Sequence, residues 1–245
     1  MRFSRSSVAR RPSTIMNVAI IAAAGQGMRM AGKRPKQFLE LAGLPVIFHT
    51  LKVFEQCDAI QEIILVVAAE ETAGFLSLAE KQDLRKIRAV VTGGATRAAS
   101  VLHGLDAVAE ADAEIVAVHD GVRPFVTPDE IARTVHAAKR EGAAILVSSP
   151  VDTIKEVKDE RIVRTLKRAE LRNALTPQCF SYKLLRRAYA DADVSDPELT
   201  DESVLVERLG VRIFTVEGSS RNIKITRLED IAIGEALLRS ASSAQ

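Results

Sequence analysis

A short glycine-containing loop near the N-terminus carries residue types that could bind a phosphate group. The apolar segment Val18–Ala24 leads directly into Gly25 and Gly27. Several cations follow closely, namely Arg29, Lys33, Arg34 and Lys36. Small residues at the end of a strand let backbone N–H groups approach a phosphate, and nearby cations neutralise its charge. The loop therefore predicts a phosphate-binding site.

Two common phosphate-binding motifs resemble this loop but do not fit it. A dinucleotide-binding fingerprint needs a third glycine where Met30 stands. A Walker A loop would use Gly27 and Lys33, but Arg34 then occupies the place of the magnesium-binding Ser or Thr. Pro35 also interrupts the helix that either motif requires. A nicotinamide-dependent dehydrogenase and a P-loop ATPase are therefore disfavoured.

Predicted strands and helices alternate along the chain and would position this loop. Continuous apolar runs predict strands that are buried on both faces, at Val18–Ala24, Ile63–Ala69, Ile87–Val91, Ile115–His119 and Ala144–Val147. Amphipathic segments between them predict helices, such as Pro45–Gln56 and the segment with Ala98, Val101 and Leu105 on one face. This alternation predicts an α/β fold with a three-layer, Rossmann-like, mostly parallel sheet. Ligands are then expected beyond the C-terminal ends of the strands.

Two helix starts carry capping signals. Thr127, Pro128 and Glu130 supply an N-cap, a proline in the first turn and a capping-box glutamate. Thr226 and Glu229 repeat the box near the C-terminus. Further helices are expected at Tyr182–Ala190, Asp201–Leu209 and from Leu228, with a strand at Arg212–Val216.

Residues 151–176 interrupt the strand–helix alternation. Thr153–Val157 and Arg161–Leu166 alternate in polarity and flank a turn-like segment at residues 158–160, which predicts a β-hairpin. Because a two-stranded ribbon is marginally stable alone, we expect it to pack on another surface, often a second subunit. A hairpin folded back on its own domain fits the pattern equally well.

The composition excludes several classes of protein. The 245 residues suit one large domain, and no apolar run is long enough for a membrane span. The net charge of +2, without any basic block, and the absence of Trp argue against a nucleic-acid partner. Cys57 and Cys179 cannot build a disulfide framework or a four-ligand zinc site, so we interpret them as packing residues in a reducing compartment.

Residues 1–16 form a basic, acid-free leader that contains Arg2, Arg5, Arg10 and Arg11. We expect a disordered leader, or a start codon placed too early, rather than a targeting peptide. A cytoplasmic protein is therefore expected, with organellar targeting by the leader left open.

Motifs in a fixed order carry a resemblance to a known family. They are Ala22–Met30 with Pro35–Gln37, Gly93–Val101, His119–Pro124, Ala174–Gln178, Thr200–Glu202 and Asn222–Thr226. Over about residues 17–240 the chain resembles the methylerythritol phosphate cytidylyltransferases of the non-mevalonate isoprenoid pathway. The resemblance implies one nucleotidyltransferase domain at 17–240, with a β-arm at about 151–176 that is used for dimerisation, and a tail at 241–245.

The resemblance also implies the reaction. The phosphate of methylerythritol phosphate would attack the α-phosphorus of CTP and release pyrophosphate. A phosphate is already a competent nucleophile, so the enzyme must align two anions and stabilise charge, and it needs no Ser, Cys or His nucleophile. Arg29 and Lys36 match the family's transition-state stabilisers, and Arg168 and Lys224 match the pair that positions methylerythritol phosphate.

Further positions match the family's substrate contacts. Arg123, Thr153 and Thr176 match contacts to the acceptor, and the cytosine and ribose pocket is matched by Ala23, Ala24, Gly25, Gly94 and Ser100. Thr153 and Arg168 lie on the arm, which in the family crosses into the partner subunit. A homodimer with a shared site is implied, although without the resemblance an exposed hairpin charge would be the preferred interpretation of Arg168.

Asp120 is the candidate metal ligand. It follows His119 at the end of an apolar run, where nucleotide-binding sheets commonly place such a carboxylate. Mg²⁺ would need only one or two carboxylates, because it keeps water and takes phosphate oxygens. A capping or structural carboxylate is the alternative, and we interpret His119 as a structural residue. His49, His103 and His136 have no ligand spacing, so no site is assigned to them.

Departures from the family's pattern concern the base pocket. Gly121 and Val122 stand where two alanines are common, and Ala95 stands where an acid is common. Selectivity for CTP is therefore less firmly predicted than the reaction class. Two alternatives remain open: a ribitol 5-phosphate cytidylyltransferase and a non-catalytic nucleotide-binding regulator.

Overall fold

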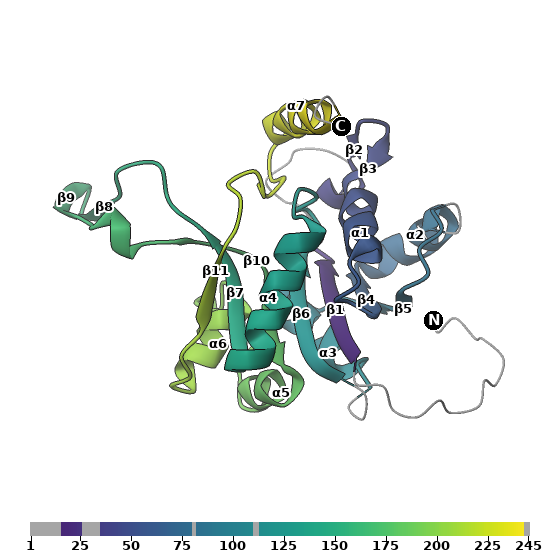
Figure 1. Cartoon of the computed structure of the whole chain (residues 1–245), viewed down its shortest axis with the longest axis horizontal. Coiled ribbons are helices and arrows are strands. Elements are labelled where there is room, and N and C mark those ends of the chain that lie inside the picture. The colour runs from purple at the N-terminus through teal and green to yellow at the C-terminus, as the bar shows by residue number, and fades with distance from the viewer. Residues whose placement is uncertain (1–15, 26–34, 80–81, 110–112, 243–245) are drawn as a thin grey trace.

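A mostly parallel sheet forms the centre of the molecule. The computed structural model describes residues 16–25, 35–79, 82–109 and 113–242. Within them a seven-stranded sheet has the order β11–β7–β10–β6–β1–β4–β5 (Figure 1). Its strands are β1 (Met16–Ala23), β4 (Glu62–Val67), β5 (Ile87–Thr92), β6 (Ala113–Asp120), β7 (Ala143–Ser148), β10 (Asn173–Ser181) and β11 (Phe214–Glu217). Only β10 runs antiparallel to its neighbours within this sheet, so the predicted architecture is confirmed.

Helices cover both faces of the sheet, which gives three layers. One face carries α1 (Val46–Gln56), α2 (Thr72–Ala79) and α4 (Pro128–Glu141), and the other carries α3 (Arg97–Asp106), α5 (Tyr182–Ala190) and α6 (Glu202–Arg208). Side chains of β1 alternate in direction, so successive residues join different core clusters. Ile21 belongs to the cluster that includes α1 and α4, and Ile20 belongs to the cluster that includes α3 and α5. This two-sided burial explains the continuous apolar runs.

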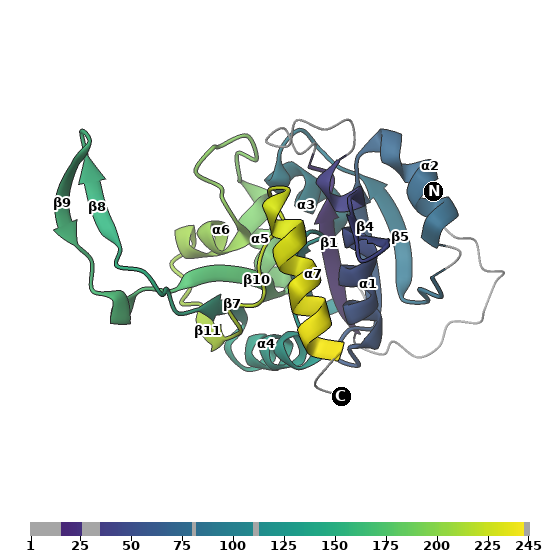
Figure 2. The same ribbon diagram turned by 90° about the horizontal axis from the view of Figure 1, so that it is seen from above.

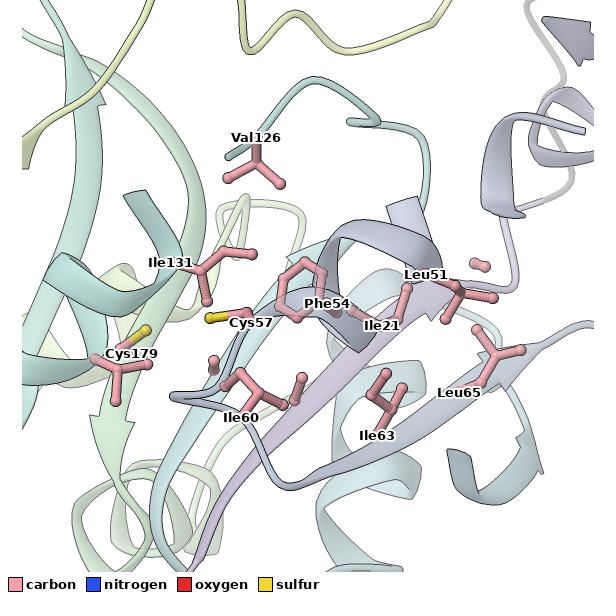
Figure 3. Packing of buried hydrophobic residues seen from close by; sticks show 14 of the residues in the cluster. Ile21, Leu51, Phe54, Cys57, Ile60, Ile63, Leu65, Val126, Ile131 and Cys179 are labelled. Carbon is pink, nitrogen blue, oxygen red and sulfur yellow. The ribbon is translucent and has the colours of Figure 1, made fainter. Parts of the chain in front are cut away.

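The core on the α1 side reaches the end of β6. Phe54 of α1 lies among Ile21, Cys57 and Ile131 (Figure 3), and its ring centroid lies 4.8 Å from that of His119. Cys57 and Cys179 are buried and form no disulfide in this core, which confirms that they are packing residues.

Smaller elements complete the fold near the C-terminal ends of the strands. The 3₁₀ turn η1 (Lys36–Phe38) follows β1 in the described chain, and the short β2 (Glu40–Leu41) and β3 (Leu44–Pro45) pair with each other. The C-terminal helix α7 (Glu229–Ser242) packs against β2. Another 3₁₀ turn, η2 (Ala69–Glu71), follows β4.

One predicted cap is confirmed and one is wrong. Thr127 and Glu130 form the expected capping box at α4. Near the C-terminus, the backbone N–H of Thr226 donates to Asp230, at 2.7 Å, and not to Glu229. Because α7 begins one residue later than expected, at Glu229, the carboxylate of the next residue is the one that reaches back.

The predicted hairpin exists and projects from the domain. Strands β8 (Lys155–Lys158) and β9 (Arg161–Thr165) pair antiparallel and are exposed along their whole length. This arm leaves the sheet between β7 and β10 and extends away from the helices, so it does not fold back on its own domain (Figures 1 and 2). It carries exposed apolar side chains, since Ile162 is 65 % and Val163 is 56 % exposed.

The strand β10 was not predicted. It returns from the arm between β6 and β7, but Pro177 interrupts the pattern of a central strand. In the structure Pro177 falls where the β7–β10 register shifts, between Ala174 and Gln178, so the ladder accommodates a residue without an N–H.

Among the helices that the structure describes, none is long and apolar enough to cross a bilayer.

Candidate active site

A cleft of about 700 Å³ opens at the C-terminal ends of the parallel strands. Its walls come from the ends of β1, β4, β5 and β6, the start of α3, the turn η1 and the loop before α7. A volume of this size accommodates a nucleotide-sized ligand. Its position agrees with the expected ligand site of a doubly wound sheet.

The predicted base-pocket residues line this cleft. They are Ala23, Ala24, Gly25, Gly94 and Ser100. The Ser100 hydroxyl accepts a hydrogen bond from the Gly94 N–H at 3.1 Å and donates to the Thr96 carbonyl at 2.8 Å. Gly93 lies so close to Ala24 that a Cβ at position 93 would stand 2.2 Å from the Ala24 Cβ. The wall is therefore closely packed and built from small residues.

Two cations from opposite ends of the chain line the same cleft. Lys36 is the first residue of η1, and Lys224 lies in the loop before α7. The third predicted cation of this region, Arg29, lies outside the described residues. The cleft can therefore present positive charge to an anionic ligand from two separate elements of the fold.

Asp120 is the centre of a charged cluster at the end of β6. The Lys224 Nζ lies 2.9 Å and the Arg123 Nε 3.3 Å from its Oδ2, and the Arg97 Nε lies 3.1 Å from its Oδ1. Burial raises the pKa of this carboxyl, but the charges of Arg97, Lys224 and Arg123 outweigh it and hold the pKa well below its usual range. Asp120 is therefore a carboxylate at any physiological pH.

A buried hydrogen-bond network fixes Asp120 from behind. The Asp120 N–H donates to the Thr176 Oγ1 at 3.2 Å, and that hydroxyl lies 2.9 Å from the His119 Nδ1. The His119 Nε2 lies 3.1 Å from the Arg123 carbonyl. Because a carbonyl only accepts, Nε2 carries the proton and Nδ1 accepts from Thr176. Both ring nitrogens of His119 are thus engaged, which fits its predicted structural role.

Arg97 and Glu202 also belong to the charged cluster, and neither was assigned a role from the sequence. The Arg97 Nη1 lies 2.7 Å from the Glu202 Oε1, so this arginine bridges Glu202 and Asp120. Burial and the neighbouring Glu202 raise the pKa of Tyr189 above its usual range, and its hydroxyl donates to Glu202 at 3.2 Å. Each of these charged residues is the first residue of a helix and lies inside one of the motifs that carry the resemblance, a signal that could have identified them.

The remaining predicted residues divide into two groups. Arg123 and Thr176 lie directly behind Asp120, where Arg123 also donates to the Asn222 carbonyl at 2.8 Å. Arg168 begins the turn η3 (Arg168–Glu170) on the arm, where it donates to the Val151 carbonyl, and Thr153 is exposed at the base of the arm. The fold of one chain therefore does not bring Arg168 or Thr153 to the cleft.

The donor set at the cleft suits a magnesium ion that arrives with a phosphate. Asp120 supplies an ionised carboxylate, and the described residues contain no group of three or more His, Cys, Asp or Glu that could hold a metal by themselves. Mg²⁺ is commonly held by one or two carboxylates together with substrate phosphates and water. Asp120 would be the protein ligand in such an arrangement.

The lining favours alignment of anions over nucleophilic catalysis by a side chain. No Cys or His is among the described residues that line the cleft, and the Ser100 hydroxyl already makes two hydrogen bonds. What converges there is the start of the glycine loop, cations and two carboxylates, Glu70 and Asp120. Such a site can bind polyphosphates and stabilise the charge that develops during phosphoryl or nucleotidyl transfer.

Comparisons with known proteins agree with this chemistry. A sequence model of the family described as 2-C-methyl-D-erythritol 4-phosphate cytidylyltransferase (IspD) matches residues 17–240. The enzyme of that name from Syntrophus aciditrophicus is 45% identical over 224 residues, which are 91% of this chain and 95% of that protein.

Solved structures show the same relationship. The 4-diphosphocytidyl-2C-methyl-D-erythritol synthase of Anaerococcus prevotii superposes with a TM-score of 0.81 at 34% identity, covering 92% of this chain and 96% of that chain. The cytidylyltransferase of Thermus thermophilus gives a TM-score of 0.72 at 33% identity, covering 92% and 100%.

Proposed function

Because this chain belongs to the 2-C-methyl-D-erythritol 4-phosphate cytidylyltransferase family, we propose that it transfers CMP from CTP to 2-C-methyl-D-erythritol 4-phosphate. The products are 4-diphosphocytidyl-2-C-methyl-D-erythritol and pyrophosphate, in isoprenoid precursor biosynthesis by the non-mevalonate pathway. The protein is an enzyme, a nucleotidyltransferase. The relatives' names favour this function over a ribitol 5-phosphate cytidylyltransferase and over a non-catalytic regulator.

One observation carries the proposal for the site. The glycine loop after β1, Lys36 and the Asp120–Lys224 pair line a single cleft, although they come from distant parts of the sequence. Two anionic substrates that repel each other need this kind of enclosure by cations.

The nucleotide occupies the end of the cleft formed by the small residues. The backbone at Ala23, Ala24 and Gly25 and the Gly94–Ser100 turn read cytosine and ribose, and the tight wall at Gly93 excludes larger bases. Lys36, together with Arg29, stabilises the charge on the α-phosphate and on the leaving pyrophosphate.

The acceptor phosphate binds on the Lys224 side. In this structure the Lys224 ammonium pairs with Asp120 and is partly exposed to the cleft. It can transfer to the acceptor phosphate, because Arg97 and Arg123 continue to neutralise Asp120. Arg123 and Thr176 support this half of the site by fixing Asp120. A phosphate oxygen of the acceptor then displaces pyrophosphate from CTP without help from a side-chain nucleophile.

Magnesium completes the charge balance. Asp120 would hold Mg²⁺, which when bound neutralises the triphosphate and makes pyrophosphate a better leaving group. Removal of divalent cations by a chelator is expected to abolish turnover, and added Mg²⁺ is expected to restore it.

The exposed arm supports a homodimer. Arg168 and Thr153 match acceptor contacts of the family but lie on the arm, away from the cleft of their own chain. Exposed apolar residues on the same arm, such as Ile162 and Val163, are suited to burial against a second subunit. We therefore place Arg168 and Thr153 in the acceptor site of the partner.

A cytoplasmic location is supported by the two unpaired, buried thiols, which suit a reducing compartment. The alternative, organellar targeting by the basic leader, depends on residues 1–15, which lie outside the described chain.

The acceptor assay tests the proposed function. Pyrophosphate release is measured with CTP and either methylerythritol phosphate or ribitol 5-phosphate. We expect turnover with methylerythritol phosphate that exceeds turnover with ribitol phosphate by a wide margin. Turnover only with ribitol phosphate, or with neither, would overturn the assignment.

A further inference from the structure

Gln37 is a buried polar residue in the wall of the cleft that has no assigned role. It is 1 % exposed and lies between Lys36, which faces the cleft, and Phe38, which packs in the core. Its Nε2 donates a hydrogen bond of 2.7 Å to the carbonyl oxygen of Ala23, the last residue of β1. A carbonyl accepts and never donates, so the amide nitrogen of Gln37 must face it.

This hydrogen bond sets the direction of the next backbone N–H. Among the described residues only the Thr176–Pro177 peptide is cis, so the Ala23–Ala24 peptide is trans and planar. In a trans peptide the C=O and N–H point in opposite directions. When Gln37 holds the Ala23 carbonyl, the Ala24 N–H is therefore directed to the side away from Gln37.

The same hydrogen bond ties Lys36 to the end of β1. Gln37 and Lys36 are adjacent in η1, and both line the cleft together with Ala23 and Ala24. The bond closes a separation of 14 residues, across the segment that lies outside the described chain. A site that uses a backbone N–H and a lysine on one ligand requires both to be fixed to within about 0.5 Å.

We propose that Gln37 is a positioning residue that orients the Ala23–Ala24 peptide and holds Lys36 beside it, so that both act on the same bound nucleotide. This inference rests on the proposed cytidylyltransferase function. Gln37 itself contacts neither substrate. It acts through the Ala23–Ala24 peptide and through Lys36.

Two substitutions of nearly equal shape separate the donor role from packing. Gln37→Met keeps the length of the side chain but removes the donor. Gln37→Glu also removes it while ionised, but a protonated carboxyl can donate to the Ala23 carbonyl again. Gln56 is exposed at the end of α1, so Gln56→Met serves as the matched control.

We expect Gln37→Met to lower kcat/KM for CTP by about 100-fold at every pH, since misplacement by about 1 Å costs roughly this much. For Gln37→Glu we expect a similar loss at high pH. As the pH falls and the carboxyl is protonated, its kcat/KM, expressed as a fraction of the wild-type value at the same pH, should rise by about tenfold. Gln56→Met should behave as wild type. The thermal unfolding temperature of each variant, compared with that of wild type, checks that the loss of activity is not due to unfolding.

Binding of CTP alone, measured by calorimetry, gives a readout that does not depend on turnover. We expect weaker CTP binding in Gln37→Met and, at high pH, in Gln37→Glu. Wild-type affinity together with wild-type kcat/KM in Gln37→Met would overturn the inference, as would a Gln37→Glu defect that does not change with pH. Failure of the wild type to turn over either acceptor would instead contradict the proposed function, and the CTP affinities would still test Gln37.

Discussion

At the scale of single residues, the site depends on how charge is shared around Asp120. The carboxylate contacts Arg97, Arg123 and Lys224, whereas Lys36 lines the cleft from the turn η1. Removal of a cation from the Asp120 cluster would leave a buried charge less well compensated, which affects folding as well as chemistry. Lys36 therefore offers the cleaner test of transition-state stabilisation.

We expect Lys36→Ala to lower kcat by about 10²–10³-fold while CTP binding remains close to that of wild type, because its charge matters most when negative charge develops on the leaving group. The matched control is Lys183→Ala, which removes an exposed lysine of α5. Steady-state kinetics and calorimetry with CTP check the prediction. A loss of CTP affinity equal to the loss of kcat/KM would show that Lys36 serves ground-state binding instead.

His119 gives a prediction about pH. Burial, assisted by the charges of Arg123 and Arg97, lowers the pKa of His119 to about 4 from the usual histidine value of about 6.5. Between pH 4 and pH 6.5, His119 is therefore protonated in the unfolded chain and neutral in the folded chain. The free energy of unfolding should fall as the pH decreases from 6.5 to 4, by at most about 3 kcal/mol from this residue, and should not change through His119 above that window.

Ring chemical shifts of the four histidines, followed by NMR, measure this directly. We expect the His119 signal to remain that of a neutral ring at pH 5.5. Urea unfolding at pH 7.5 and pH 5, with the exposed His136→Gln as control, checks the linked loss of stability. A His119 that titrates near pH 6.5 in the folded protein would contradict the buried network described above.

At the scale of elements, one wall of the cleft forms where the ends of β1 and β5 meet the start of α3. Gly93 follows β5 and abuts Ala24 after β1, and Ser100 of α3 closes the turn. The base-binding wall is thus a packing interface between three elements, and its shape depends on the absence of a Cβ at Gly93.

Gly93→Ala should therefore destabilise the fold by about 1–3 kcal/mol and raise the KM for CTP, because the new Cβ would lie 2.2 Å from the Ala24 Cβ and 2.9 Å from the Ser100 Oγ. Gly74→Ala is the matched control, since Gly74 lies in α2 with no atom within 4 Å of an added Cβ. There the change should stabilise by about 0.5–1 kcal/mol. Urea denaturation and CTP kinetics compare the two; equal effects would mean that the wall is not tightly packed in solution.

At the scale of the whole molecule, a complementation experiment tests whether the arm serves the partner's site. We expect Lys36→Ala and Arg168→Ala dimers each to be nearly inactive. When the two are mixed and allowed to exchange subunits, each heterodimer contains one site with both residues intact if Arg168 acts across the interface. About a quarter of wild-type activity should then return. No recovery, despite subunit exchange shown by native mass spectrometry, would place Arg168 in the site of its own chain or outside the site.

Sequence patterns were sufficient for the elements that are buried on both faces. The runs of Val and Ile in β1, β4 and β6 can satisfy their burial only in a covered parallel sheet, so their type and order could be predicted. The strand β10 could not, because Pro177 contradicts a central strand and only the register shift beside it resolves the conflict. Similarly, Thr226 predicted a cap but not which of two neighbouring acids would reach it.

The candidate site was predictable where a motif names its members: Ala23–Gly25, Lys36, Gly94, Ser100, Asp120 and Lys224 all line the cleft. Pairings between distant segments were not. Arg97 and Glu202 are 105 residues apart, and the sequence contains nothing that pairs them in advance. Likewise, Gln37 is an ordinary polar residue until its carboxamide is seen at the Ala23 carbonyl. Such contacts depend on how three layers pack, which local patterns do not encode.

We expect the cleft to align two phosphates and to supply no nucleophile of its own. The stereochemical course of the reaction tests this most directly. The enzyme is given CTP that carries a single sulfur-substituted configuration at the α-phosphorus, with methylerythritol phosphate as acceptor, and the configuration of the product is determined. A single direct displacement predicts inversion at phosphorus; retention, which would require an intermediate bound covalently to a side chain, would contradict the account.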